Sequence, residues 1–364
     1  MSNTKSVQKD PFIRIVKRDE LPRRKTIVLR VLALVLALIA GGLFMLATGS
    51  NPIEVFSTII TGCLRSPAAI QATIKIMIPL VITSLGVTLA FKMRFWNIGA
   101  EGQIIMGATF ASYFALFHAD LPHFVLVIIM FIAGIVGGGL WALIPTIFKV
   151  KFNTNETLFT LMLNYIALYT INLLRDGPFR DPNSPGYVKI ASFLPNALLA
   201  KVFGINIGWI IMIILTVVVF VYLKYSKQGY EISVVGGSQA TASYAGMNVK
   251  KIMLRTMFIS GAICGLAGMI QATGADGTLS SSVAGGVGFT AIIIAWLGNL
   301  NPFSIFGISA AFAILEKGSR VVESNMNISA DNSAVLQGII LFFIIGCEFF
   351  FRYKFQTRSK KAGE

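Results

Sequence analysis

The sequence predicts an all-α, polytopic membrane helical bundle, and its composition, its apolar runs and its charge distribution are the observations that predict it. Hydrophobic residues make up 55% of the 364-residue chain and charged residues 13%, with a mean hydropathy of +0.74. Soluble domains carry roughly 25% charged residues, so this depletion indicates a bilayer as the solvent. No polar stretch is long enough to bury a core of its own, and we therefore expect a single membrane domain.

A membrane-spanning helix needs about 20 mostly apolar residues, and about ten segments are candidates. The first exceeds the apolar region of a signal peptide, so we expect it to remain as a span. Two later candidates are short and flank the turn signal Gly298–Pro302, so they are either two short spans or one re-entrant hairpin. The candidates are 27–46, 68–91, 98–117, 123–148, 156–174, 207–223, 256–274, 286–298, 302–317 and 333–351.

The positive charge predicts the orientation. Cytoplasmic loops of membrane proteins are enriched in Lys and Arg. With the N-terminus inside and an even number of spans, the inner segments hold 23 of the 31 Lys and Arg, so we expect both termini in the cytoplasm. Because the charge lies in loops rather than along one folded face, it argues against nucleic acid. The predicted organisation is a basic N-terminal segment 1–26, a transmembrane domain 27–351 and a basic tail 352–364.

No constellation typical of catalysis, metal binding or nucleotide binding emerges. The sequence has no Gly-x-x-x-x-Gly-Lys-Ser/Thr loop to cradle phosphates, and its two His, His118 and His123, lie at a predicted outer membrane edge. Its three Cys are far apart and have no metal-ligand spacing, so we interpret them as small buried apolar residues. We therefore expect no enzyme activity, no catalytic residues, no metal and no cofactor on this chain. If ATP drives it, ATP and Mg²⁺ bind another chain.

The stretch FKMRFWNIGAEGQ, residues 91–103, places polar groups between two apolar runs. Asn97-Ile98-Gly99 predicts the break that turns the chain back, and Glu101 with Gln103 gives the next span a polar start. Farther along, Asn164 lies two turns into an apolar run, where a buried amide needs a partner. Helix capping and interhelical hydrogen bonds are the simpler interpretation. Contact with a polar permeant is the alternative, with Asn97, Glu101, Gln103 and Asn164 as candidate pathway-lining residues.

Glycine marks two further features. The pairs Gly134/Gly138 and Gly261/Gly265 have the four-residue spacing that lets helices pack closely in a membrane. The Asn97–Gly99 break and the Gly285–Gly298 segment are both punctuated by Gly and adjoin broken apolar runs. We consider them corresponding parts of two halves of a transport fold.

The segment 224–255 is a long connector on the predicted cytoplasmic side. Its centre, Ser238–Gly246, is small and helix-tolerant with Gly on both sides, which predicts a short helix at the membrane surface between two flexible joints. Connectors longer than a few residues are often functional. A solvated surface loop is the alternative.

Several motifs, taken together and in order, resemble one family. The chain looks like the bacterial ABC-transporter permeases for branched-chain amino acids, ribose and nucleosides, over about residues 27–351. Within that group it most resembles the permeases paired with basic-membrane-protein-type lipoproteins, which import nucleosides. The motifs are RFWNIGAEGQ (94–103), NETLFTLMLNYIALY (155–169), GGSQATASYAGMNVKK (236–251), SGAICGLAGM (260–269) and GFTAIIIAWLGNLNPFSIFGISAAFAILEKG (288–318).

The resemblance implies an all-helical permease in the bacterial cell membrane and three kinds of partner. A homologous second permease subunit, or a second copy of this chain, completes the pathway; a cytoplasmic ATPase drives it; and an extracytoplasmic lipoprotein delivers the permeant. The resemblance also assigns residues 236–248 to the segment that docks on the ATPase, although Val234–Gly237 stands where the family commonly has Arg-Ala-x-Gly. The implied coupling residues are Gly236, Gly237, Ser238, Ala240, Thr241, Tyr244, Ala245 and Gly246.

We therefore predict an ABC importer permease that moves nucleosides by alternating access. Purine and pyrimidine nucleosides are not distinguished, and a permease for ribose or another simple sugar is the alternative. An ion-coupled secondary transporter is a third possibility, which the small number of carboxylates near the predicted spans disfavours.

Overall fold

The computed structural model is mostly helical, and its chain divides into two compact units. We call Met1–Ile59 with Ser319–Glu364 the terminal unit and Ile60–Gly318 the central unit. The basic segments 1–26 and 352–364, Cys347 and the predicted span 333–351 lie wholly or partly outside the described residues. The structure describes residues 13–17, 23–184, 186–326, 328–329, 331–332, 335–340, 342–343, 346 and 353–357.

The terminal unit combines helices with a strand pair. Helix α1 (Arg23–Ala47) contains the predicted first span, and the part of it from Val35 meets α2 (Pro52–Leu64) at a bend of 115°. Strand β1 (Ile13–Lys17) pairs antiparallel with β4 (Tyr353–Thr357), so segments from the two ends of the chain lie together. The all-α prediction missed this pair, because its two short strands come from opposite ends of the chain.

The central unit contains most of the predicted spans. Five described helices are long and apolar enough to cross a membrane, or six if the bent pair α1–α2 counts as one span. Three of the helices given below lie outside that set: α4 has a polar start, α11 is short, and the second half of α12 carries charged residues such as Glu316 and Lys317. By length and composition, the described helices therefore give fewer membrane spans than the predicted count of about ten. The helices are α3 (Pro67–Lys92), α4 (Ala100–Phe117), α5 (His123–Phe152), α6 (Glu156–Asp176), α7 (Gly208–Tyr225), α10 (Val249–Ile270, continued by a π-helical turn to Asp276), α11 (Val287–Leu297) and α12 (Pro302–Met326).

The most extensive helix contact in the central unit joins α5 and α10. The predicted glycines make this contact possible: a Cβ at Gly134 would lie 2.8 Å from Met269 Cβ, and one at Gly265 would lie 2.8 Å from Gly138 Cα. The two helices run antiparallel and their backbones meet almost directly. The prediction of glycine-mediated packing is confirmed.

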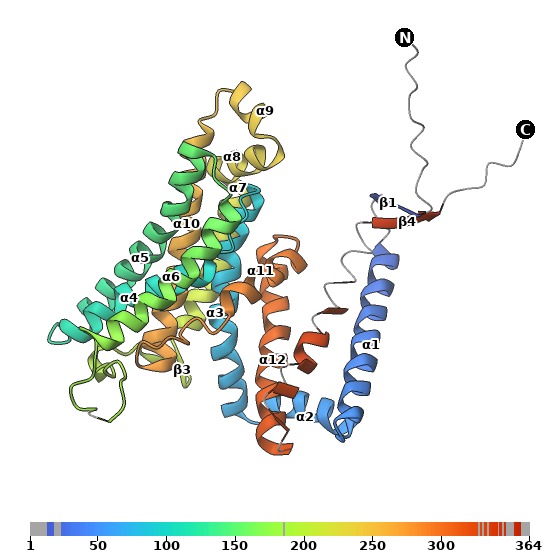
Figure 1. The fold of residues 1–364 in the computed structure, drawn as a ribbon, viewed down its shortest axis with the longest axis horizontal. Helices are drawn as coiled ribbons and strands as arrows, with labels where there is room; N and C mark the ends of the chain where they lie inside the picture. Colours follow the sequence, from blue (N-terminus) through green and yellow to red (C-terminus); the bar gives the residue numbers. More distant parts are fainter. Residues whose placement is uncertain are drawn as a thin grey trace, which may run out of the picture. The chain divides into compact units, whose positions relative to one another are not determined.

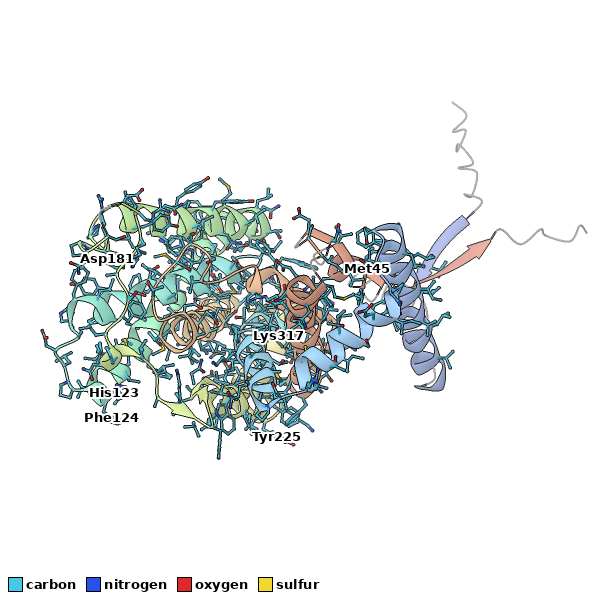
Figure 2. All side chains as sticks on the ribbon, turned by 90° about the horizontal axis from the view of Figure 1, so that it is seen from below. Met45, His123, Phe124, Asp181, Tyr225 and Lys317 are labelled. Atoms are coloured by element: carbon cyan, nitrogen blue, oxygen red, sulfur yellow. The ribbon has the colours of Figure 1, made fainter. Side chains whose placement is uncertain are left out.

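The two ends of the central unit differ (Figure 1). At one end α8 (Lys227–Gly237) and α9 (Gln239–Tyr244) connect α7 to α10, beside the last residues of α3. At the other end the long connector from α6 to α7 contains a 3-10 turn (Pro195–Ala197) and the hairpin β2 (Lys201–Val202)–β3 (Ile205–Asn206). His123 Nδ1 lies 2.8 Å from the Asn196 carbonyl at this second end (Figure 2). The two long connectors, α6 to α7 and α7 to α10, therefore lie at opposite ends of this unit.

Candidate functional site

The break after α3 is built by two buried amides. Asn97 and Gln103 are 0% and 1% exposed, and they pair through Asn97 Nδ2–Gln103 Oε1 (3.3 Å) and Gln103 Nε2–Asn97 Oδ1 (3.1 Å). Asn97 Oδ1 also accepts from the Gly99 N–H at 3.0 Å. The two side chains therefore satisfy each other and hold the turn that starts α4.

Helix α6 is fastened to the same break by Asn164, which is 5% exposed. Its Nδ2 donates to the Ile98 carbonyl at 2.9 Å, and its Oδ1 accepts from the Gly102 N–H at 2.9 Å. Thr160, one turn earlier, accepts from the Ile98 N–H at 3.2 Å. Since the turn leaves these backbone groups without helical partners, α6 supplies the partners that an apolar interior demands.

Glu101 connects this break to a second one. Its Oε1 accepts from the Gly286 N–H at 2.8 Å and its Oε2 from the Gly288 N–H at 2.7 Å, at the first turn of α11. Gly286 has φ = +82°, a conformation that glycine adopts readily and other residues rarely do. The start of α4, which follows the Asn97–Gly99 break, is thus hydrogen-bonded to the start of the Gly285–Gly298 segment, which we predicted to be its counterpart.

We call Asn97, Glu101, Gln103, Thr160 and Asn164 the polar cluster. Each of the four predicted pathway residues makes hydrogen bonds inside the protein, which agrees with the capping interpretation. Their contact with a permeant stays a prediction. Thr160 and the α11 glycines that donate to Glu101 were not predicted, although the run Gly285-Gly286-Val287-Gly288 before an apolar segment is a recognisable signal of an unusual helix start.

The second candidate site is the connector segment 224–255, in which the structure has two helices, α8 and α9. The short helix expected near Ser238–Gly246 is present as α9, with Ser238 Oγ accepting from the Thr241 N–H at 3.2 Å. Helix α8 before it was not predicted. Its first turn is capped by Ser226 Oγ, which accepts from the Gly229 N–H at 2.9 Å.

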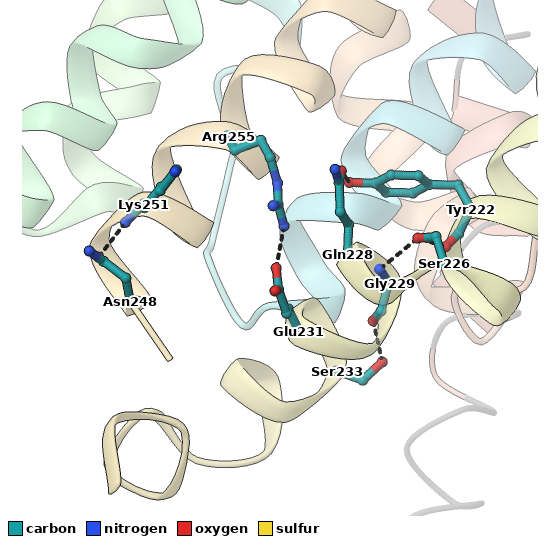
Figure 3. A network of polar contacts seen from close by, with 9 residues as sticks. All are labelled: Tyr222, Ser226, Gln228, Gly229, Glu231, Ser233, Asn248, Lys251 and Arg255. Atoms are coloured by element: carbon teal, nitrogen blue, oxygen red, sulfur yellow. Dashed lines mark hydrogen bonds and ion pairs between the residues drawn. The ribbon is translucent and has the colours of Figure 1, made fainter. Parts of the chain in front are cut away.

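Side chains from α7 and α10 hold α8 in place (Figure 3). Arg255 Nη2 lies 2.8 Å from Glu231 Oε2, in an ion pair whose side chains are largely shielded, and Tyr222 OH donates to Gln228 Oε1 at 2.9 Å. Gly236 is buried, and a Cβ there would overlap the carbonyl oxygen of Lys92 at the end of α3. Helix α8 is therefore joined firmly to the helices behind it.

Helix α9 is different, because most of its side chains face away from the protein. Tyr244 is 94% exposed, whereas Ala242 is fully buried and anchors the helix. Of the eight implied coupling residues, Gly236 is buried and the other seven are exposed: Gly237, Ser238, Ala240, Thr241, Tyr244, Ala245 and Gly246. A small exposed helix on a rigid base has the form of a docking surface.

The other side chains considered in the sequence analysis show no chemistry of their own. Cys63 and Cys264 are buried free thiols, as expected for apolar packing, and Cys347 lies outside the described residues. Within the part of the chain that the structure describes, no three His, Cys, Asp or Glu side chains gather as metal ligands.

Comparison with known proteins gives a family match and several relatives. Residues 69–345 match the family described as branched-chain amino acid transport system / permease component. A glucose ABC transporter permease protein of Haloferax volcanii is 29% identical over 345 residues, covering 92% of this chain and 90% of the relative. A nucleoside ABC transporter permease protein of Lactococcus lactis subsp. cremoris is 30% identical over 333 residues (88% and 91%). A guanosine ABC transporter permease protein of Bacillus subtilis is 28% identical over 319 residues (86% and 91%).

Proposed function

Because the chain belongs to the family of branched-chain amino acid transport system permease components, we propose that it carries nucleosides through an ABC importer. The chain is a permease, a transport component rather than an enzyme, and a multi-pass protein of the cell membrane. The observation that carries the nucleoside assignment is the similarity to nucleoside and guanosine permeases along nearly their whole length.

A simple sugar such as ribose is the second candidate permeant, because a glucose permease is similar over the same length. Nucleosides and sugars are both uncharged and rich in hydroxyls. The chain contains 28 Phe, whose faces suit a flat base or a sugar ring. An ion-coupled secondary transporter gains no support, since Glu101 is engaged by two backbone N–H groups.

We place both termini and the α8–α9 end of the central unit in the cytoplasm, with about ten spans in all. The α8–α9 end carries Lys92, Lys149, Lys224 and Lys251, as the enrichment of cytoplasmic ends in basic residues requires. The pairing of β1 with β4 supports an even number of spans, because it holds segments from both chain ends together.

Three partners complete the proposed importer. A cytoplasmic ATPase, which binds ATP and Mg²⁺, docks on the exposed side of α9, so that α8 passes its motion to α3, α7 and α10. A homologous permease or a second copy of this chain forms the other half of the pathway. An extracytoplasmic substrate-binding lipoprotein delivers the permeant, and rocking of helix bundles around a midplane site gives alternating access.

Uptake measurements test the permeant. Labelled guanosine, uridine and ribose are offered to a deletion strain with and without this chain, and each is competed with an excess of the other two and of leucine. We expect chain-dependent nucleoside uptake that ribose and leucine barely reduce. Strong competition by ribose would favour the sugar permease, and collapse of uptake by an uncoupler at constant ATP would contradict an ABC importer.

A further inference from the structure

Helix α11 is apolar but too short to cross a membrane on its own. It has 11 residues and therefore rises about 16 Å, roughly half of the ~30 Å apolar core. Its last turn carries Trp296, which stacks on Trp96 with ring centroids 5.6 Å apart, just beyond the basic end of α3. Its first turn meets Glu101. We therefore place the N-terminus of α11 near the middle of the membrane.

The chain reaches this point through a non-helical segment. After the π-helical turn at the far end of α10, residues 277–286 return without regular structure, and Ser281, Ser282 and Gly285 are exposed. Non-helical backbone at membrane depth is tolerated only where it is buried in protein or borders water. Leu279, Val283 and Ala284 are buried in the protein, whereas the exposed Ser281, Ser282 and Gly285 fit the wall of a water-filled pathway.

A helix that starts beside such a pathway would normally offer an anion site. Its free N–H groups and its dipole attract negative charge, and broken helices in transporters bind the anionic groups of their substrates in this way. In this chain the site is already filled, because Gly286 N–H and Gly288 N–H donate to the two Glu101 oxygens at 2.8 and 2.7 Å. An ionised carboxylate has only acceptors, so it matches two donors.

The absence of a side chain at Gly288 lets both the backbone and the carboxylate of Glu101 come this close, since a Cβ there would overlap the Glu101 backbone nitrogen. A Cβ at position 288 would lie 2.6 Å from Glu101 Cα and 2.8 Å from Glu101 Oε2, which is nearer than real Cβ atoms approach. The contact therefore needs a glycine on one side and a side chain of the length of Glu on the other. Both features sit where the two broken segments of the fold meet.

We propose that Glu101 is a positioning residue that occupies the N-terminus of α11 in place of a permeant's negative charge. The pathway beside it is therefore suited to an uncharged permeant, such as a nucleoside or sugar, rather than to the carboxylate of an amino acid. The assignment rests on the proposed transport function. It adds the charge class of the permeant and names the residue that sets it.

Chemical rescue with acetate tests the proposal on the full importer in detergent and in proteoliposomes. Glu101→Ala removes the carboxylate and leaves room for acetate at the α11 N-terminus. We expect nucleoside uptake to fall at least tenfold, and acetate, but not chloride at equal ionic strength, to restore several-fold activity and to raise the melting temperature. Glu156→Ala is the matched control, since Glu156 is also a first-turn glutamate, and acetate should not rescue it.

Wild-type uptake should not respond to acetate, because its site is filled. The proposal is overturned if folded Glu101→Ala transports at the wild-type rate, if acetate changes neither its uptake nor its melting temperature, or if acetate inhibits the wild type. The melting measurement needs no permeant, so it reports on Glu101 even if nucleosides prove to be the wrong substrate. Gly288→Ala, whose methyl group would overlap the Glu101 backbone nitrogen and crowd its carboxylate, should also lower uptake and should not be rescued. Full activity of that variant would contradict the contact.

Discussion

The polar cluster and α9 are both polar interruptions of an apolar chain, yet the structure gives them opposite surroundings. The three amides of the cluster are at most 5% exposed and each is hydrogen-bonded to a neighbouring element. Tyr244 on α9 is 94% exposed. Similar sequence signals therefore mark a buried, hydrogen-bonded framework in one place and, in the other, an exposed helix that we propose as a docking surface. Loss of a framework residue should lower stability, and loss of a docking residue should lower association.

The largest loss of stability is expected for Asn164→Leu. It leaves the Gly102 N–H and the Ile98 carbonyl without their partner in an apolar interior, and each unpaired group costs about 1–3 kcal/mol. The melting temperature of the purified chain in detergent should fall by several degrees. Met162→Leu is the control, because Met162 is 65% exposed on the same helix. Equal melting temperatures for the two variants would show that the hydrogen bonds of Asn164 do not stabilise the fold.

A neighbouring pair of glycines sharpens the comparison at the base of α9. Gly236→Ala would place a methyl group on the carbonyl of Lys92, and such overpacking costs about 1–3 kcal/mol. A Cβ at Gly237 would have no atom within 4 Å, so Gly237→Ala should leave the free energy of unfolding nearly unchanged. Thermal unfolding of the two variants in parallel checks this. A destabilised Gly237→Ala with an unchanged Gly236→Ala would contradict the contact between α8 and α3.

A smaller loss is expected for Glu231→Gln, which breaks the ion pair with Arg255 between α8 and α10. The two side chains are 18% and 28% exposed, so the pair is partly screened, and about 1 kcal/mol of stability is at stake. Asp181→Asn is the control, since its pair with Lys189 has a 48% exposed lysine and lies in the opposite connector. A larger loss of stability for Asp181→Asn than for Glu231→Gln would show that shielding from solvent does not strengthen the Glu231–Arg255 ion pair.

The sequence predicted the long helices well, because continuous apolar runs determine them, as α3, α5 and α6 show. It also predicted the glycine contact of α5 with α10 and the position of α9. It missed α8, whose mixed residues carry no apolar run, and the strand pair β1–β4, which depends on segments from opposite ends of the chain. The backbone N–H groups that donate to Glu101 were missed for the same reason, since 185 residues separate Glu101 from Gly286.

The smallest effect on stability, and the largest on assembly, is expected at α9. Tyr244→Ala removes an almost fully exposed ring, so the melting temperature should stay at the wild-type value. Tyr187→Ala, which removes a 74% exposed ring from the opposite connector, is the matched control.

The amount of ATPase that co-purifies with each variant, measured beside its melting temperature, separates a docking role of α9 from a structural one. We expect Tyr244→Ala to lose most of the ATPase at an unchanged melting temperature, while Tyr187→Ala keeps it and Asn164→Leu melts early. Wild-type retention of the ATPase by Tyr244→Ala, or equal loss from both tyrosine variants, would contradict the account of α9 as the surface that couples ATP hydrolysis to this permease.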